Sequence, residues 1–252
     1  MITRTNLNDI QKTGRLGNQL WAIASAIGIA ENNNIPFYFP NWNYQRWFSH
    51  ELPSNSDIYS GRFKIYNEQS SYYEDIKLNA KYDWDLRGYF QSYKYFDEYK
   101  NLIYQYLTPN FETNEFPKNA VSIHVRRGDY LNLSHIHSIL TEEYYKEAMS
   151  FFPDKRFLVF SDDIEWVKYC GWFDHELCYF VEQVRKEYLT APQELMDLFY
   201  MSRCDSNIIA NSSFSWWAAY LNNHQDKIVV APKVWVNDED RNDRLPEKWV
   251  KL

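Results

Sequence analysis

The second half of the chain alternates short apolar segments with segments of helical periodicity, and this alternation is the feature that most restricts the fold. The apolar segments have the length of buried strands, and the segments between them carry apolar residues at helical spacing. Strands that alternate with helices form a parallel sheet with helices on both faces, so the pattern predicts an α/β fold. Strands are expected at 120–125, 156–161, 207–210 and 227–232, and helices at 141–152, 164–169, 190–204 and 214–221.

The first half of the chain carries the same order on a smaller scale. A short apolar opening is followed by a glycine turn at 14–19, an apolar helix at 20–30 and a strand at 35–40. This is the pattern of a βαβ unit. Further on, residues 86–91 have the composition of a strand and residues 97–106 that of a helix.

Two stretches suggest how the chain is divided. Residues 41–85 are rich in Asn, Ser, Tyr and Trp and weakly periodic, so irregular structure with short elements is expected there. The polar stretch 108–117 contains two prolines and is the best candidate linker. We therefore predict two Rossmann-like domains, 1–115 and 116–252, that face each other across a cleft.

The composition disfavours several classes of function. Asp and Glu (34) outnumber Lys and Arg (27), and the formal net charge is −7, so nucleic acid and anionic membranes are poor partners. Three irregularly spaced cysteines indicate neither a zinc site nor a disulfide framework. The polar N-terminus, and apolar runs shorter than about 20 residues, favour a cytoplasmic protein with at most peripheral membrane association. Aromatic residues make up 19% of the chain, which leaves rings available for flat ligands such as sugars.

The strongest local motif is HVRRGDY at 124–130, which follows a predicted strand. Ligands of open α/β sheets bind at that end of the strands. Arg126 and Arg127 have the forked donors that fit phosphate oxygens. Gly128 allows a sharp turn, and Asp129 adds a carboxylate suited to acid or base chemistry. A diphosphate site and a structural Arg–Asp ion pair explain this motif equally well.

A second motif, NIIANSSFSWW at 207–217, runs from a strand into a helix through small polar residues. The free N–H groups and the dipole at a helix N-terminus attract phosphate, and serine hydroxyls add donors. An ordinary serine N-cap is the alternative. The candidate ligand-binding residues are Asn211, Ser212, Ser213, Phe214 and Ser215.

A third motif, GRLGNQ at 14–19, places two glycines in a turn before the first predicted helix. This spacing is weaker than a full dinucleotide-binding fingerprint, and no acidic residue is clearly placed for a ribose about 20 positions on. We therefore infer no NAD site. A ligand contact and a tight turn remain open as explanations of this motif.

Several carboxylates and histidines raise the question of a metal ion. SDD at 161–163 follows a strand, where its carboxylates can hold a metal, bind a base or ribose, or cap the next helix. The acidic strings at 83–85 and 238–240 lack a convincing strand-loop context, and His135 and His137 lack a third ligand at matching spacing. We expect no metal site.

Taken together, these segments resemble glycosyltransferase family 11, the α-1,2-fucosyltransferases. The pattern HxRRxD occurs more widely among fucosyltransferases that use GDP-fucose, whereas NSSFSWW points to this family. Ser206 and His137–Ser138 are departures from residues that are usual in such proteins. The matching segments are GRLGNQL at 14–20, LRGYFQSYKYF at 86–96, HVRRGDY at 124–130, FSDDIEWVK at 160–168 and NIIANSSFSWWAAYL at 207–221.

The resemblance implies a GT-B-like fold, with an acceptor-side domain at 1–115 and a GDP-fucose-binding domain at 116–252. It also implies inverting, metal-independent transfer of fucose, without a cofactor, from GDP-fucose to the 2-hydroxyl of a β-galactoside acceptor glycan. The expected setting is glycan or polysaccharide synthesis.

The roles of individual residues follow from this resemblance. Arg126 is expected to meet the leaving phosphate with support from Arg127, and His124 to orient the strand end or contact the nucleotide. Asp129 is either the general base or a group that only orients Arg126. The further expected substrate-binding residues are Gly17, Asn18, Gln19, Gln91 and Asp162, together with the residues at 211–215.

Two alternatives remain at this stage. One is a fucosyltransferase of another linkage or acceptor, because HxRRxD does not determine which hydroxyl reacts. The other is a catalytically silent module that binds a sugar nucleotide or a glycan, which the aromatic composition permits. The intact Arg126, Arg127 and Asp129 argue against the second alternative.

Overall fold

The computed structural model describes residues 1–55, 58, 61–111, 119–181, 191–237 and 242–252. The chain divides into two compact units: unit 1 is Met1–Asn110 with Asn242–Pro246, and unit 2 is Phe111–Arg241 with Glu247–Leu252. The predicted boundary at 115/116 lies outside the described residues. Residues 242–246, which we expected in the second domain, belong to unit 1 because Asp243 and Arg244 bond to its residues.

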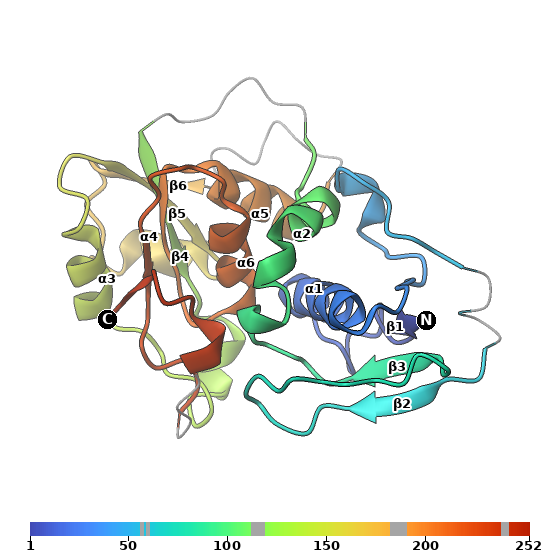
Figure 1. Cartoon of the computed structure of the whole chain (residues 1–252). Coiled ribbons are helices and arrows are strands. Elements are labelled where there is room, and N and C mark those ends of the chain that lie inside the picture. The colour runs from blue at the N-terminus through green and yellow to red at the C-terminus, as the bar shows by residue number, and fades with distance from the viewer. Residues whose placement is uncertain (56–57, 59–60, 112–118, 182–190, 238–241) are drawn as a thin grey trace. The chain divides into compact units, whose positions relative to one another are not determined.

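Unit 2 is built on a six-stranded parallel sheet with the order β6-β5-β4-β7-β8-β9 (Figure 1). Counted within the unit, this is the order 3-2-1-4-5-6 of the Rossmann fold, and the direction of winding reverses between β4 and β7. The strands are β4 (Ala120–Val125), β5 (Arg156–Ser161), β6 (Cys178–Phe180), β7 (Ser206–Ile208), β8 (Val229–Ala231) and β9 (Val250–Lys251).

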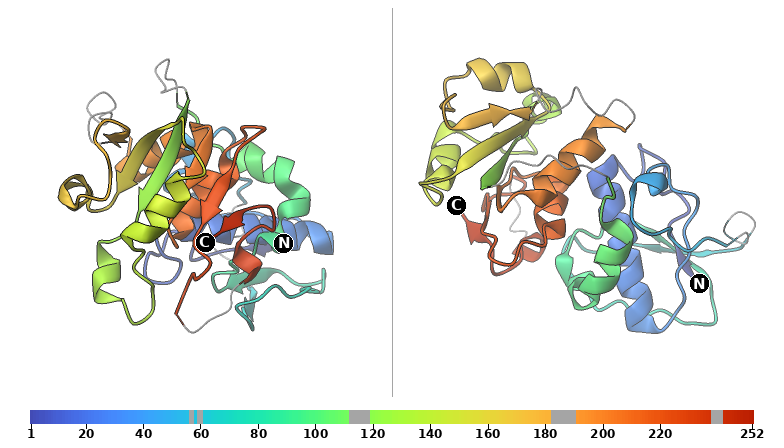
Figure 2. Two further views of the ribbon diagram at one scale, coloured as in Figure 1. Left: turned by 90° about the vertical axis from the view of Figure 1, so that its left-hand side faces the viewer. Right: turned by 90° about the horizontal axis from the view of Figure 1, so that it is seen from above.

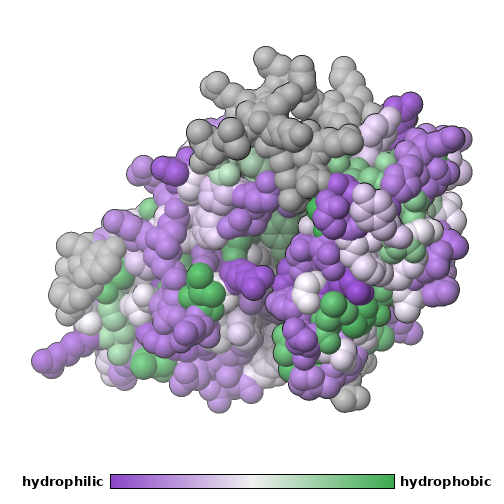
Figure 3. All heavy atoms as spheres, turned by 180° about the vertical axis from the view of Figure 1, so that it is seen from behind, coloured by the Kyte–Doolittle hydropathy of each residue, from purple (hydrophilic) through white to green (hydrophobic). Residues whose placement is uncertain are grey.

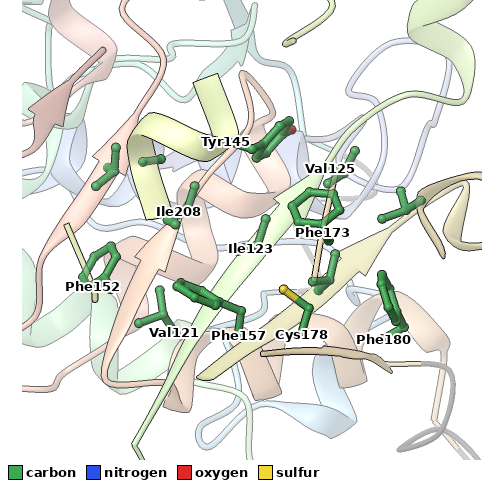
Figure 4. Packing of buried hydrophobic residues seen from close by; sticks show 14 of the residues in the cluster. Val121, Ile123, Val125, Tyr145, Phe152, Phe157, Phe173, Cys178, Phe180 and Ile208 are labelled. Atoms are coloured by element: carbon green, nitrogen blue, oxygen red, sulfur yellow. The ribbon is translucent and has the colours of Figure 1, made fainter. Parts of the chain in front are cut away.

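Helices cover both faces of this sheet (Figure 2). On one face, Val121, Ile123 and Val125 share a core with Tyr145 of α3 and Val167 of α4 (Figure 4 shows most of this cluster). The alternate residues Ser122 and His124 point to the other face, where they contact Asn207 and Phe214. The helices are α3 (Glu142–Met149), α4 (Ile164–Tyr169), α5 (Gln193–Arg203) and α6 (Ser213–Leu221).

The sequence predicted unit 2 well. The strands expected at 120–125 and 156–161 and the helix at 164–169 have the predicted bounds, and the other predicted elements are shifted or shortened at their ends. The near-continuous apolar character of strands buried on both faces explains this success. The short strands β6 and β9 were missed, because strands of two or three residues carry no periodic signal.

Unit 1 contains a smaller parallel sheet with the order β1-β3-β2. Its strands are β1 (Ile2–Thr3), β2 (Lys64–Asn67) and β3 (Trp84–Arg87), and its α-helices are α1 (Leu16–Asn33) and α2 (Lys100–Leu107). Short 3-10 helices occur at η1 (Gln45–Trp47), η3 (Tyr93–Tyr95), η4 (Asp97–Tyr99) and η8 (Asn242–Arg244) in unit 1, and at η5 (Asp129–Asn132) in unit 2.

Two strand predictions in unit 1 were inaccurate. The strand expected at 35–40 is reduced to an isolated bridge between Ile2 and Phe37, because Pro36 and Pro40 have no N–H to donate to a ladder. The strand expected at 86–91 ends at Arg87, where Gly88 turns the chain with a φ of +134°. Within 41–85, where we expected irregular structure with short elements, residues 64–67 form the short strand β2.

Helix α1 is buried on nearly all sides, as its small apolar residues predict. Trp21 packs against Phe96, with ring centroids 5.4 Å apart. Gly28 lets the backbone of Tyr95 approach so closely that a Cβ on Gly28 would lie 1.9 Å from the carbonyl oxygen of Tyr95.

Within the described residues, no helix has both the length and the apolar character to cross a bilayer. Viewed from behind, the surface is largely hydrophilic with separate apolar patches (Figure 3).

Candidate functional site

The carboxyl ends of β4, β5 and β7 bring the three predicted motifs of unit 2 together. These strands are parallel neighbours, with Val125 opposite Ser161 and Ile123 opposite Ile208. The chain segments that follow them, at 126–129, 162–163 and 209–215, therefore leave the sheet at one edge. This edge lies at the reversal of winding, where ligands bind in open α/β sheets.

Arg126 lies at the centre of this edge. Its Nη2 bonds to Asp129 Oδ1 at 2.6 Å and its Nη1 to Asp162 Oδ2 at 3.1 Å. Its Nε is buried and has no hydrogen-bond partner among the described residues. The guanidinium also lies 5.2 Å from the centre of the Tyr130 ring. The predicted pairing of Arg126 with Asp129 is present, and Asp162 is a second carboxylate partner that sequence reasoning did not identify.

Arg127 is held in a different way. Its backbone N–H donates to Asp162 Oδ1 at 2.9 Å, and its Nε donates to Asp163 Oδ2 at 3.2 Å. Its guanidinium lies 3.8 Å from the centre of the Trp166 ring, a cation–π contact. The carboxylate and the ring together fix Arg127 against α4. The support that we expect Arg127 to give at the leaving phosphate stays a prediction.

Asp162 connects the two arginines, and Gly128 makes room for it. A Cβ on Gly128 would lie 2.5 Å from Asp162 Oδ2. The Asp162 carboxylate is tied to the Arg127 N–H and to Arg126, so it has little freedom to move aside. The glycine of the motif is therefore required by this close approach.

His124 is the second-last residue of β4, and its side chain faces α6. It is buried, its ring lies 5.5 Å from that of Phe214, and its Nδ1 has no partner among the described residues. The pKa of His124 is lowered to about 3, chiefly by burial and then by the positive charge of Arg126. The negative charge of Asp162 opposes this shift but has a smaller effect. The imidazole is therefore neutral at neutral pH.

The start of α6 is a capped helix N-terminus. Ser212 accepts a hydrogen bond from the Phe214 N–H at 3.4 Å, and Ser213 and Phe214 are half-buried. The Ser215 hydroxyl is buried and bonds to the backbone oxygens of Ala210 and Ser212. The serine N-cap is present, and it leaves Ser213 and Phe214 as the accessible residues of the motif.

Asn211 and Tyr130 join the motifs to each other. The Asn211 amide is buried and donates to the backbone oxygens of Ser138 and Trp235. The Tyr130 hydroxyl donates to Asn211 O at 2.9 Å, and its ring stacks on His137 with centroids 4.2 Å apart. Tyr130, which we quoted only as part of a motif, thus connects the loop that carries Arg126 to the turn before α6.

In unit 1 the motif at 14–19 meets the segment at 86–96. Gln91 Nε2 donates to Asn18 Oδ1 at 3.0 Å, and Arg244 Nε donates to Gln91 Oε1 at 3.0 Å. Gly17 is buried in the first turn of α1. Gln19 is also buried, and its amide bonds to Gly14 O and Trp42 Nε1. The structure brings Asn18 and Gln91 together. The ligand contacts expected of Gly17, Asn18, Gln19 and Gln91 stay predictions.

Two arginines of unit 1 were missed. Arg244 gives no local signal, because its partner Gln91 lies far away in the sequence. Arg4 follows β1 and is fully buried, with its Nη2 donating to Gly88 O at 2.6 Å. Burial lowers the pKa of Arg4 to about 10, while Asp85 and Glu68 act in the opposite direction. Through its hydrogen bond to Gly88 O, Arg4 helps to fix the turn that precedes Gln91.

Two of the carboxylates that raised the question of a metal are engaged elsewhere. Asp83 pairs with the N-terminal amine, and Asp85 with Arg87 and Thr5. The string at 238–240 lies outside the described residues. Within the part of the chain that the structure describes, no group of three or more His, Cys, Asp or Glu side chains is arranged to hold a metal ion.

Comparison with known proteins places this geometry in context. The model of the family "Glycosyl transferase family 11" matches residues 40–252. An Escherichia coli α-1,2-colitosyltransferase is 34% identical over 202 residues, which cover 73% of this chain and 68% of that protein. The Escherichia coli O-antigen biosynthesis glycosyltransferase WbnK is 32% identical over 216 residues, covering 75% and 68%. A putative Caenorhabditis elegans galactoside 2-α-L-fucosyltransferase is 22% identical over 251 residues, covering 85% and 68%.

Proposed function

We propose, since this chain belongs to glycosyl transferase family 11, that it transfers fucose from GDP-fucose to the 2-hydroxyl of a galactoside in glycan or polysaccharide synthesis. The observation that carries the proposal is the position of Arg126. It lies at the carboxyl edge of a Rossmann-type sheet, at the reversal of winding, with a buried Nε donor that lacks a partner among the described residues. A buried donor without a partner costs about 1–3 kcal/mol, so an oxygen of a bound phosphate would stabilise it.

The chemical demand of the reaction matches this edge. Breaking the fucose–phosphate bond places negative charge on the leaving GDP and positive charge on the sugar. Arg126 meets the charge on the phosphate, and Arg127, held by Asp163 and Trp166, keeps the loop in place. The first N–H groups of α6 add donors and the favourable end of the helix dipole. A preorganised donor of this kind typically contributes about 10²–10³-fold in rate.

Inversion in one displacement requires a base that takes the proton of the acceptor hydroxyl. Asp129 is the candidate, since its carboxylate is partly exposed and adjacent to Arg126. The alternative is that Asp129 only orients Arg126. Asp129→Asn separates the two roles. Loss of the base lowers kcat by about 10²–10⁴-fold with the KM for donor retained, whereas loss of orientation raises the KM for donor.

The finer features of the proposal follow from the same family. The two units adopt a GT-B arrangement with a cleft between them. Unit 2 binds GDP-fucose and unit 1 binds a β-galactoside. The enzyme requires neither metal nor cofactor and works in the cytoplasm with at most peripheral attachment to a membrane. Nucleic acid is not a partner, because the net charge of −7 opposes binding to phosphate backbones.

A second donor is favoured by one specific observation. The relative that is 34% identical is an α-1,2-colitosyltransferase, and colitose is the 3-deoxy form of fucose. GDP-colitose is therefore the competing donor. A site that hydrogen-bonds the 3-hydroxyl of fucose would reject GDP-colitose strongly, since it would leave buried polar groups unpaired.

The test is product analysis with both donors. The protein is incubated with GDP-fucose or GDP-colitose and a panel of β-galactosides, with EDTA present, and the linkage of each product is determined. We expect an α-1,2-fucosylated product whose yield is the same without EDTA. If only an α-1,2-colitosylated product formed, the donor would be GDP-colitose and not GDP-fucose. A fucosylated product with a different linkage would identify a fucosyltransferase of another kind. Binding of GDP without turnover of either donor would favour the silent binding module.

A further inference from the structure

The hydrogen-bonded chain of Arg244, Gln91 and Asn18 has a fixed direction. Arginine carries only donors, so the Gln91 amide must turn its oxygen toward Arg244 Nε, 3.0 Å away. The NH₂ of Gln91 then points to Asn18 and donates to its oxygen at 3.0 Å. Both amide orientations are consequently set by the guanidinium at the end of the chain.

This direction decides what the cluster offers to a ligand. The amide oxygens of Gln91 and Asn18 each accept a hydrogen bond within the cluster. The Asn18 NH₂, at the end of this hydrogen-bonded series, is therefore the group that can bind a ligand. Nδ2 of Asn18 has no hydrogen-bond partner among the described residues, and Asn18 and Gln91 are both half-buried and thus reachable from solvent. The Asn18 NH₂ is therefore an accessible donor that suits the lone pairs of ligand oxygens.

The surrounding structure holds this cluster in place. Gly14, with a φ of +89°, leaves space for the Asn18 amide, because a Cβ there would lie 2.5 Å from Nδ2. The segment that carries Arg244 is tied to unit 1 through Asp243, which accepts from the Tyr73 N–H at 2.8 Å and pairs with Lys94. Asn242–Pro246 thus forms part of unit 1 although it lies near the C-terminal end of the sequence.

We propose that Asn18 binds an oxygen of the acceptor sugar through its amide N–H groups, and that Arg244 acts through Gln91 as the positioning residue that sets this polarity. The inference rests on the proposed function, which makes a galactoside the second substrate. Phosphate oxygens of the donor share the same chemistry. The acceptor is the assigned ligand because the two arginines and the helix N-terminus suited to a diphosphate lie in unit 2. The exposed end of the Arg244–Gln91–Asn18 hydrogen-bonded series is a neutral amide.

Asn18→Asp is the most direct variant. Aspartate still accepts the bond from Gln91, so the chain stays intact, but it offers no N–H to a ligand. A ring oxygen has no proton to offer a carboxylate, and a hydroxyl would have to turn its own proton toward it. Loss of one such hydrogen bond corresponds to about a tenfold change in affinity.

Two variants test the role of Arg244. Arg244→Met removes the donor that orients Gln91 and should raise the KM for acceptor with little change in kcat or in the KM for GDP-fucose. Arg244→Lys keeps a donor and should recover part of the loss. Lys77→Gln is the matched control, since it removes a positive charge from an exposed ion pair elsewhere in unit 1. Thermal unfolding of each variant identifies a change that merely loosens the segment.

The deciding experiment measures binding without turnover. Lactose and GDP are each titrated into the wild type and Asn18→Asp, by ligand-observed NMR and by calorimetry. We expect lactose to bind about tenfold more weakly to the variant while GDP binding stays within about twofold. Unchanged lactose binding, weakened GDP binding instead, or no lactose binding by the wild type would each overturn the inference. Failure of the proposed function would be seen separately, as a wild type that turns over neither sugar nucleotide.

Discussion

The two candidate sites are built in opposite ways. The edge of the sheet in unit 2 consists of charged groups that follow adjacent strands, with Arg126 and Arg127 paired to Asp129, Asp162 and Asp163. The cluster in unit 1 is a chain of neutral amides ended by one arginine, drawn from residues 18, 91 and 244. The first arrangement suits a phosphate whose charge changes during reaction, and the second suits a neutral sugar. The proposed assignment of the two substrates therefore rests on this difference in charge.

The largest effect is expected at Arg126, and it would sharpen this contrast. Arg126→Ala removes the cation that we propose for the leaving phosphate and should lower kcat/KM by about 10²–10³-fold. The measurement is initial velocity with GDP-fucose and a galactoside. Arg156→Ala, at an exposed position on β5 paired with Tyr179, is the control and should keep normal turnover. Near wild-type activity in a folded Arg126→Ala would remove this residue from the mechanism.

A second prediction concerns the buried network that supports the edge of unit 2. Asn207 donates to Ser122 Oγ and Met201 O and accepts from Asn222 Nδ2. Asn207→Leu leaves these groups unpaired and should destabilise the protein by about 2–3 kcal/mol. Denaturant unfolding measures the loss. The neighbouring exposed Asn223→Ala should leave the free energy of unfolding unchanged, and an equal loss in both variants would speak against the network.

Two glycines allow the same comparison to be made at the level of the backbone. Gly14 and Gly171 have similar positive φ angles, +89° and +79°, but only Gly14 has a neighbour, Asn18, where a Cβ would lie. Alanine at either position should cost about 1–2 kcal/mol in strain. Gly14→Ala should in addition raise the KM for acceptor, because it displaces the Asn18 amide. If Gly171→Ala had the same kinetic effect, crowding of Asn18 would not be the cause.

The effect that is smallest near neutral pH is a pH dependence of stability. The pKa of His124 is about 3 in the folded protein and about 6.5 when the chain is unfolded. Below about pH 6.5 the unfolded state therefore binds a proton that the folded state does not. Stability from this group is complete above that pH and falls by about 1 kcal/mol per pH unit as the pH drops toward 3. Asn in place of His124 should flatten the slope of unfolding free energy against pH between 6 and 4, and an unchanged slope would contradict the assignment.

The sequence revealed most of unit 2 and much less of unit 1, for a physical reason. The strands β4 and β5 are buried on both faces, so they are recognisable in the sequence as apolar runs. The candidate site residues follow each strand directly along the chain. Parallel pairing then brings 126–129, 162–163 and 211–215 to one edge. In unit 1 the pairing of Gln91 with Arg244 joins residues 153 positions apart, and no local pattern encodes such a contact. The strand expected at 35–40 failed because its prolines prevent a ladder.

The most direct test of the account is a crystal structure of the protein with GDP bound. We predict the diphosphate at the carboxyl ends of β4 and β7, with oxygens within hydrogen-bond distance of Arg126 and of N–H groups at the start of α6. A diphosphate bound instead to Asn18 and Gln91 in unit 1 would contradict it, because the charged edge and the amide cluster would then have exchanged their substrates.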